Sequence, residues 1–353
     1  RNLDVSGISN CTRMFTNSTA KHIDASEWDT RNVTDLDSMF YFCQQLETLN
    51  LKNWNTKNVE NSYQFLWYCE KLESVDVSSF NMSKNRDMSR MFGECYSLVK
   101  IKGIEYFDTS QSGSVAAMFQ ACRKLKEIDV SSFDTSNSGY FHYMFAGCDS
   151  LERIIGIENF NTSKNRLFNC MFSGCGKLKE VDISSFDTSS SDTFDSMFQD
   201  CGELTELDLS NFDSSKANSY NSMFDGCGKL KTIYASKNFE NINTAASTAM
   251  FKNCTNLVGG AGTAFDPTFI DATAARIDGG SENPGYFTDI KDKPAESVAD
   301  QTASDESAID IPTAGDYIED ESQEQDLETT APAPAVTPSA NNSDDEEGTG
   351  TNN

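Results

Sequence analysis

Eleven cysteines and two histidines are the residues of this chain whose chemistry could build a site. Nine cysteines recur every 26 or 27 residues, a spacing that could align thiols for metal binding or redox chemistry. Such sites normally use C-x-x-C pairs or histidine partners, and the sequence has neither. We therefore interpret the nine as buried, reduced thiols that fill space in a structural ladder, with disulfides between neighbouring repeats and metal binding as the alternatives. These ladder cysteines are Cys43, Cys69, Cys95, Cys122, Cys148, Cys175, Cys201, Cys227 and Cys254.

The remaining candidates for catalysis are isolated. His22 and His142 lie 120 residues apart, in different repeats, so they cannot share a site in a rod. Cys11 and Cys170 fall outside the ladder, and we interpret Cys170 as a local packing residue. The segment 260–262 lacks the third glycine of a dinucleotide-binding loop. The sequence therefore predicts a protein that is not an enzyme and has no catalytic residues, no cofactor and no metal.

The cysteines belong to a repeat that runs through most of the chain. A Met-Phe pair stands four residues before each ladder cysteine, replaced once by Phe65-Leu66, and a leucine follows three residues after the cysteine. An aromatic residue precedes the pair by eleven positions. Periods of 20–50 residues are typical of solenoids and propellers. The aromatic positions are Trp28, Trp54, Phe80, Phe107, Phe133, Phe160, Phe186, Phe212 and Phe239.

Each repeat predicts two elements. The segment 125–131 alternates apolar and polar residues, the pattern of a half-buried strand. Between Val33 and Leu46, apolar residues recur every three or four positions, which predicts a short helix or helical turns. Such a unit buries its apolar face only by stacking. The sequence thus predicts an α/β repeat: a leucine-rich-repeat-like solenoid of about ten coils, with one short parallel strand and one short helical segment per coil.

The combination of motifs resembles a known family. L-x-x-L-x-L is the strand signature of leucine-rich repeats, and here it is joined to F-D-T-S and M-F-x-x-C-x-x-L, as in Met39-Phe40 through Leu46. Together they are similar to the BspA-type surface repeats of host-associated bacteria, also found in mycoplasma-type lipoproteins. An aromatic residue stands where ordinary leucine-rich repeats carry an asparagine. The backbone polar groups at that bend must therefore find other partners, for which the adjacent Asp or Asn is a candidate.

Charge and composition divide the chain into two parts. Residues 1–290 contain all 24 phenylalanines and are predicted to form the solenoid, with a degenerate first coil at 1–27 and a C-terminal cap at 258–290. Leu3-Asp4-Val5-Ser6 aligns with the aromatic motif, so the chain opens within a repeat, and we expect it to be a fragment of a longer protein. Residues 291–353 carry a net charge of −15 of the total −27 and are predicted to be a disordered acidic tail or linker.

The outward positions of the predicted strands are the candidate binding surface. They are mostly acidic or hydroxyl-bearing, and this favours an ordinary solvated face. Basic and apolar residues interrupt them in the coils that carry one extra residue, which favours a ligand footprint. A calcium ion between Asp182 and Asp208 is a third hypothesis, although two carboxylates are few ligands. The candidate ligand-binding residues are Lys100, Lys102, Arg153, Ile155 and Tyr234.

The resemblance implies adhesion at a bacterial surface. We expect a non-enzymatic adhesin, extracellular or on the surface of a host-associated bacterium, that binds a host or neighbouring-cell protein or glycan through a solenoid face. A structural spacer that presents another domain and an accessory module of a larger secreted hydrolase are the alternatives. The net charge of −27 disfavours nucleic acid as a partner, the apolar runs are too short to span a membrane, and we expect a monomer.

Overall fold

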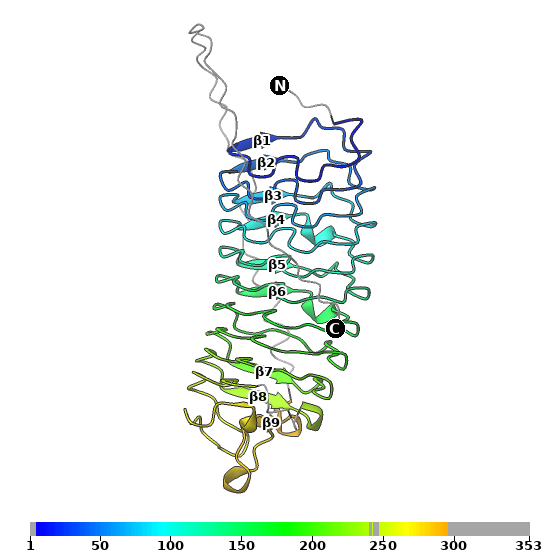
Figure 1. The fold of residues 1–353 in the computed structure, drawn as a ribbon. Helices are drawn as coiled ribbons and strands as arrows, with labels where there is room; N and C mark the ends of the chain where they lie inside the picture. Colours follow the sequence, from blue (N-terminus) through cyan, green and yellow to red (C-terminus); the bar gives the residue numbers. More distant parts are fainter. Residues whose placement is uncertain (1–4, 240–241, 243–246, 296–353) are drawn as a thin grey trace, which may run out of the picture. The chain divides into compact units, whose positions relative to one another are not determined.

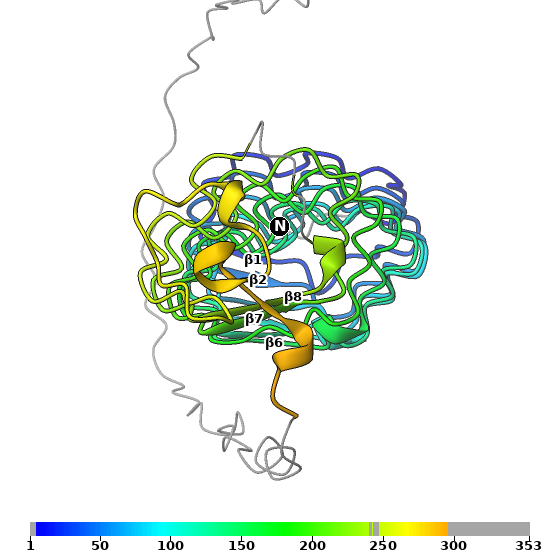
Figure 2. The same cartoon turned by 90° about the horizontal axis from the view of Figure 1, so that it is seen from below.

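A computed structural model describes residues 5–239, 242 and 247–295 of the chain. Within this part the chain winds into successive coils that stack along one axis, which confirms the leucine-rich-repeat-like solenoid (Figure 1). Figure 2 looks along the stack and shows the strands together on one side of the coils. Leu3 and Asp4 of the expected first coil lie outside the described residues, and so does the expected acidic tail from residue 296 on.

Short parallel strands mark one side of the solenoid. Within the described residues, eight of them recur at the same place of the coil, and a ninth belongs to the C-terminal cap. In β2, β3 and β4 the middle residue is buried, as Val75 and Ile101 are, while its neighbours are exposed. The coil around Val181 has no assigned strand. The strands are β1 (His22–Asp24), β2 (Thr48–Asn50), β3 (Ser74–Asp76), β4 (Lys100–Lys102), β5 (Glu127–Asp129), β6 (Arg153–Ile155), β7 (Glu206–Leu209), β8 (Thr232–Ala235) and β9 (Phe287–Asp289).

The repeat register carries through into the pairing. His22 pairs with Thr48 and Glu127 with Arg153, each in parallel and one repeat apart. The described residues form the sheets β1-β2, β3-β4, β5-β6 and β7-β8-β9. Because every coil repeats the same residue positions, side chains of one position form a column along the solenoid. The 3-10 helices are η1 (Ile104–Tyr106), η2 (Ile157–Asn159), η3 (Lys237–Phe239), η5 (Ala272–Ala274), η6 (Gly280–Glu282) and η7 (Ile290–Asp292).

The columns of apolar residues fill the interior. The aromatic positions and the repeat leucines are buried, and so are the Met-Phe pairs except Met14 and Phe15 in the first coil, which are partly exposed. Phenylalanine rings stack between coils, with 5.7 Å between the centroids of Phe119 and Phe145 and 5.9 Å between Phe145 and Phe172. The solenoid is therefore held together by side chains that meet their own equivalents one repeat away.

The segment expected to be helical differs from a helix. It is a run of turns in which N–H groups bond alternately within the coil and to the next coil: Met39 donates to Leu36 O (3.1 Å), and Phe40 donates to Phe65 O (3.0 Å). Ser38 and Phe42 have positive φ angles of 53° and 59°. An α-helix would use all these N–H groups internally. Turns form here in place of a short helix, because stacking at strand spacing needs half of these N–H groups between coils.

A threonine satisfies the bend after the aromatic residue in six of the described coils. Thr56 Oγ1 donates to Asn81 O (3.0 Å) and accepts from Asn81 N (2.7 Å), so one hydroxyl holds both backbone groups of the next coil. The Asn81 side chain accepts from Ser83 N within its own coil (3.1 Å). The Thr of the F-D-T-S motif thus takes the place of the asparagine of ordinary leucine-rich repeats, while the adjacent Asx residue caps a local turn.

The C-terminal cap closes the solenoid and extends further than expected. Strand β9 adds to β8, with Tyr234 opposite Thr288. Lys293 Nζ lies 2.8 Å from Asp208 Oδ2, and the compact unit ends at Ala295. The expected boundary at residue 290 is therefore too early, because the side chain of Lys293 belongs to the last strands.

One carboxylate organises this cap. Asp278 is 8% exposed and accepts hydrogen bonds from Thr263 Oγ1 (2.7 Å) and from the N–H groups of Ala261, Thr263, Gly280 and Gly285. Burial raises its pKa, but these hydrogen bonds outweigh burial, so the pKa lies below its ordinary value. The charged form of Asp278 therefore stabilises the glycine-rich final coil.

Candidate functional site

The strands present two columns of outward side chains, which together we name the strand face. The first column contains the first residue of each strand, from His22 to Thr232, and the second column contains the third residue, from Asp24 to Tyr234. Most of these side chains are exposed, and the strands lie together on one side of the coils (Figures 1 and 2). The strand face is thus the surface that the repeat leaves available for contact.

Much of the second column has a structural duty. Asp76, Asp129 and Asp182 each accept a hydrogen bond from the N–H two residues later, at 2.9 to 3.0 Å. Such Asx turns end the strand and aim the chain toward the aromatic position. The acidic side chains of the second column therefore serve largely as turn caps. The calcium hypothesis has no support from Asp208, whose carboxylate contacts Lys293 and Ser210, and the described residues contain no cluster of three or more metal-ligating side chains.

Two of the coils with one extra residue, those of β4 and β6, replace this turn cap by a glycine and a 3-10 helix. Gly103 and Gly156 have φ angles of 92° and 87° and begin η1 and η2. A Cβ on Gly103 would lie 2.3 Å from Ser78 Cα, and one on Gly156 would lie 2.2 Å from Ser131 Cα. The outward residue before each glycine is thereby released from turn capping, which explains why Lys102 and Ile155 stand there.

The structure brings four of the five sequence-predicted residues to the middle of the strand face. Lys100 and Lys102 lie on β4, and Arg153 and Ile155 on β6, with β5 between them (Figure 1). Lys102 pairs with Asp76 at 2.7 Å, and Arg153 lies 3.8 Å from Glu127. Hydrogen bonding to the Asp76 carboxylate raises the pKa of Lys102.

Exposed apolar side chains flank these cations. Val99 is 52% exposed and Tyr106, in η1, is 71% exposed. Lys100 is exposed and forms no ion pair within the part of the chain that the structure describes. We name Val99, Lys100, Lys102, Tyr106, Arg153 and Ile155 the central patch. Sequence reasoning missed Val99 and Tyr106, although an apolar residue at 99, where most other coils carry Glu or Lys, was a usable signal.

Tyr234 does not belong to this surface. It is 6% exposed, and Lys293 Nζ lies 5.4 Å from its ring centroid. Residues 287–293 cover it because β9 pairs with β8. The prediction that Tyr234 contacts a ligand is therefore wrong, since sequence spacing alone could not show that the cap folds back along this strand.

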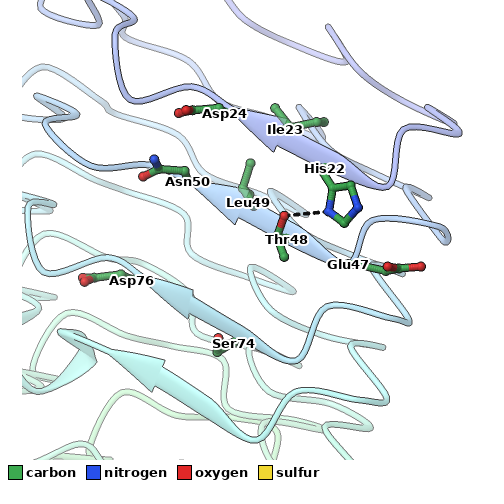
Figure 3. Close-up of a pocket in the computed structure, with 9 residues that line it drawn as sticks. All are labelled: His22, Ile23, Asp24, Glu47, Thr48, Leu49, Asn50, Ser74 and Asp76. Atoms are coloured by element: carbon green, nitrogen blue, oxygen red, sulfur yellow. Dashed lines mark hydrogen bonds between the residues drawn. The ribbon is translucent and has the colours of Figure 1, made fainter. Parts of the chain in front are cut away.

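A hollow of about 420 Å³ opens on the strand face over β1, β2 and β3, which sequence reasoning missed (Figure 3). His22 Nδ1 and Thr48 Oγ1 are 2.9 Å apart at one side, and Asp24, Asn50 and Asp76 form the other (Figure 3). Hydrogen bonds from Ser26 hold the pKa of Asp24 below its usual range. This hollow offers hydrogen-bond donors and acceptors. His142 lies in another coil, so the two histidines are not brought together.

The ladder cysteines are buried and hydrogen-bonded. Each Sγ donates to the carbonyl of the preceding coil, for example Cys69 to Phe40 O (3.3 Å) and Cys148 to Phe119 O (3.1 Å). Burial raises the pKa of the Cys148 thiol to about 12. A protonated thiol thus supplies an S–H donor to a backbone carbonyl inside the core. Cys170 is partly exposed, and the structure records every cysteine as unpaired.

Comparisons with solved structures return leucine-rich-repeat proteins. A leucine-rich repeat protein from Bacteroides ovatus is 18% identical, with a TM-score of 0.30, over 63% of this chain and 68% of its own. A structure described as a TLR13-ssRNA13 complex is 17% identical, with a TM-score of 0.27, over 67% and 35%. The Leptospira interrogans LRR protein LIC12759 is 11% identical, with a TM-score of 0.19, over 61% and 72%.

No helix within residues 5–239, 242 and 247–295 combines the length and apolarity that a bilayer crossing requires. A search of curated proteins gave no significant match. The repeat itself matches a family model three times, over residues 1–101, 69–179 and 152–261. These matches span most of the solenoid, and the chain belongs to the family described as "Mycoplasma protein of unknown function, DUF285".

Proposed function

We propose that this chain is a non-enzymatic bacterial surface protein of the BspA type that binds an extracellular protein through the central patch of its strand face. The observation that carries the proposal is a cluster of cations beside exposed apolar side chains on an acidic molecule. The folded part is acidic overall, yet the middle of its uncovered face combines the cations Lys100, Lys102 and Arg153 with exposed Val99 and Tyr106.

The chemistry of the patch suits a protein with an acidic, partly apolar surface. Lys102 and Arg153 already contact Asp76 and Glu127, so a partner carboxylate must compete there, whereas Lys100 is available. Charged groups of this kind steer association and select partners, and apolar side chains beside them supply area that can be desolvated. A repeated scaffold fixed by backbone bonds between coils holds the backbone of these residues in place, so binding orders side chains only.

The test is a binding screen of the full chain against immobilised extracellular-matrix proteins and glycans. The double variant Lys100→Glu and Arg153→Glu should not bind the immobilised protein that the wild type binds. The matched control reverses two exposed lysines outside the strand face, Lys52→Glu and Lys57→Glu, and should bind like the wild type. Equal binding by all three chains would overturn the placement, and absence of any partner would favour a spacer that presents another domain.

A further inference from the structure

A second surface lies on the arc of the coil that carries the Met-Phe pair. Backbone bonds join three consecutive coils there: Arg90 N donates to Ala116 O, and Ala117 N donates to His142 O, each at 2.9 Å. Val115 N donates to Tyr140 O (3.3 Å), which places Tyr140 on the same arc. We name this surface the alanine-centred patch. Its residues are Tyr63, Trp67, Arg90, Ala116, Ala117, Tyr140, His142 and Tyr143.

One side of the patch is a fixed guanidinium. The Arg90 guanidinium carbon lies 5.2 Å from the ring centroid of Trp67 and 5.9 Å from that of Tyr63, and its Nη1 donates to Tyr63 Oη (3.0 Å). Trp67 is itself buried against Gly93, where an added Cβ would lie 2.2 Å from the indole ring. Arg90 is nevertheless exposed. Its remaining N–H groups are thus preoriented toward solvent.

The other side is a group of exposed aromatic rings. Tyr140 is 47% exposed and Tyr143 37% exposed, and the ring of His142 lies between them, with centroids 6.1 and 5.9 Å away. His142 Nδ1 is buried and has no hydrogen-bond partner among the described residues. Tyr143 has a φ angle of 59°, as the equivalent residues of other coils do, and a bulky residue adopts this conformation at a cost. A large aromatic side chain thus occupies a position whose backbone conformation glycine would adopt without strain.

The residues between the two sides have small side chains, and their backbone groups cannot bind a ligand. Ala116 and Ala117 are 5% and 3% exposed and carry only methyl groups. The N–H groups of Arg90 and Ala117 are used between coils, so a peptide cannot pair with this arc as an added strand. A ligand must therefore be recognised by side chains alone, through aromatic rings, tyrosine hydroxyls and one guanidinium.

We propose that the alanine-centred patch binds an acidic saccharide. A sugar ring presents C–H groups that pack on aromatic rings and hydroxyls that bond to Tyr140 and Tyr143, while a sugar carboxylate matches the planar fork of Arg90. The acidic chain otherwise repels such a ligand, so a guanidinium already held in place is the feature that selects for it. This site lies on different residues from the central patch and does not depend on it.

The test is a titration of the full chain with sialyllactose paired with lactose, and with oligogalacturonate paired with its methyl ester. Tyr143→Gly should weaken binding of an acidic member about tenfold while the unfolding temperature stays unchanged or rises, because glycine relieves the left-handed backbone. Arg90→Gln should remove the preference for the acidic member over its neutral counterpart.

Two controls separate this site from the rest of the molecule. Ser196→Gly changes the equivalent left-handed position of another coil, and Lys100→Glu changes the central patch; both should bind the saccharide like the wild type. The proposal is overturned if neither acidic saccharide binds, if acidic and neutral members bind equally, or if Tyr143→Gly binds as well as the wild type. Binding of a protein that is lost with the same two variants would also overturn it, since the ligand class would be wrong.

Discussion

Replacing Phe145 with alanine tests whether stacked rings hold the coils together. The ring is fully buried between Phe119 and Phe172, at centroid distances of 5.7 and 5.9 Å. Truncation of a buried phenylalanine costs about 3–5 kcal/mol through lost transfer energy and the cavity left behind. Collapse into that cavity is restricted, because Phe119 N and Phe145 N are each bonded to the next coil at 3.0 Å. We therefore expect a loss within this range.

The assay is urea denaturation followed by circular dichroism, with Thr232→Ala as the matched control. Thr232 points outward from β8 and is only partly buried, so its truncation should change the free energy of unfolding by no more than about 0.5 kcal/mol. Because solenoid stability is a sum of contacts between neighbouring coils, Phe145→Ala should also lower the cooperativity of unfolding. Costs that are equal within about 0.5 kcal/mol for the two variants would refute the assignment of inward and outward positions.

Three further predictions concern the backbone, the thiols and the cap. Gly156→Ala should lower the melting temperature more than Gly262→Ala, because only a Cβ on residue 156 would meet a neighbouring coil, at Ser131. Both glycines have a positive φ angle, so an equal loss of melting temperature would contradict the close approach at Gly156. Under native conditions iodoacetamide should modify Cys170 before any ladder cysteine, as read by peptide mass spectrometry, since the ladder thiols are buried. Because the pKa of Asp278 is lowered, its contribution to stability is present above about pH 4 and is lost as the pH falls through the folded pKa. The melting temperature of Asp278→Asn should therefore differ from that of the wild type at pH 7, and the two should converge in acid. A difference in melting temperature that does not depend on pH would contradict this role of Asp278.

The repeat made the solenoid predictable, because identical spacing in every coil forces identical positions to stack. The alternation around Ile128 predicted strand β5, and the Met-Phe and cysteine columns predicted the core. Three-residue spacing misled the helix prediction, since a chain of turns around Ser38 buries the same apolar positions. Periodicity reports which residues face inward, and it does not report whether N–H groups bond within a coil or between coils.

The binding surface was less predictable. Lys100 and Arg153 could be placed on the outward side because strands alternate strictly. Tyr234 could not be excluded, because its cover is β9, more than fifty residues later in the chain. The turn-capping role of Asp76 and Asp129 also escaped sequence reasoning, since residue type alone does not distinguish a carboxylate that caps a turn from one that is only solvated. For Tyr234, what sequence spacing lacks is the contact with a segment outside the repeat.

The most direct test of the strand-face proposal is hydrogen–deuterium exchange of the full chain with and without the protein partner identified in the binding screen. Protection on binding should appear in peptides that cover residues 99–106 and 152–158, which carry the central patch. Peptides around residue 57, outside the strand face, should exchange at the same rate in both states. Protection confined to segments other than β4 to β6 would contradict the proposal.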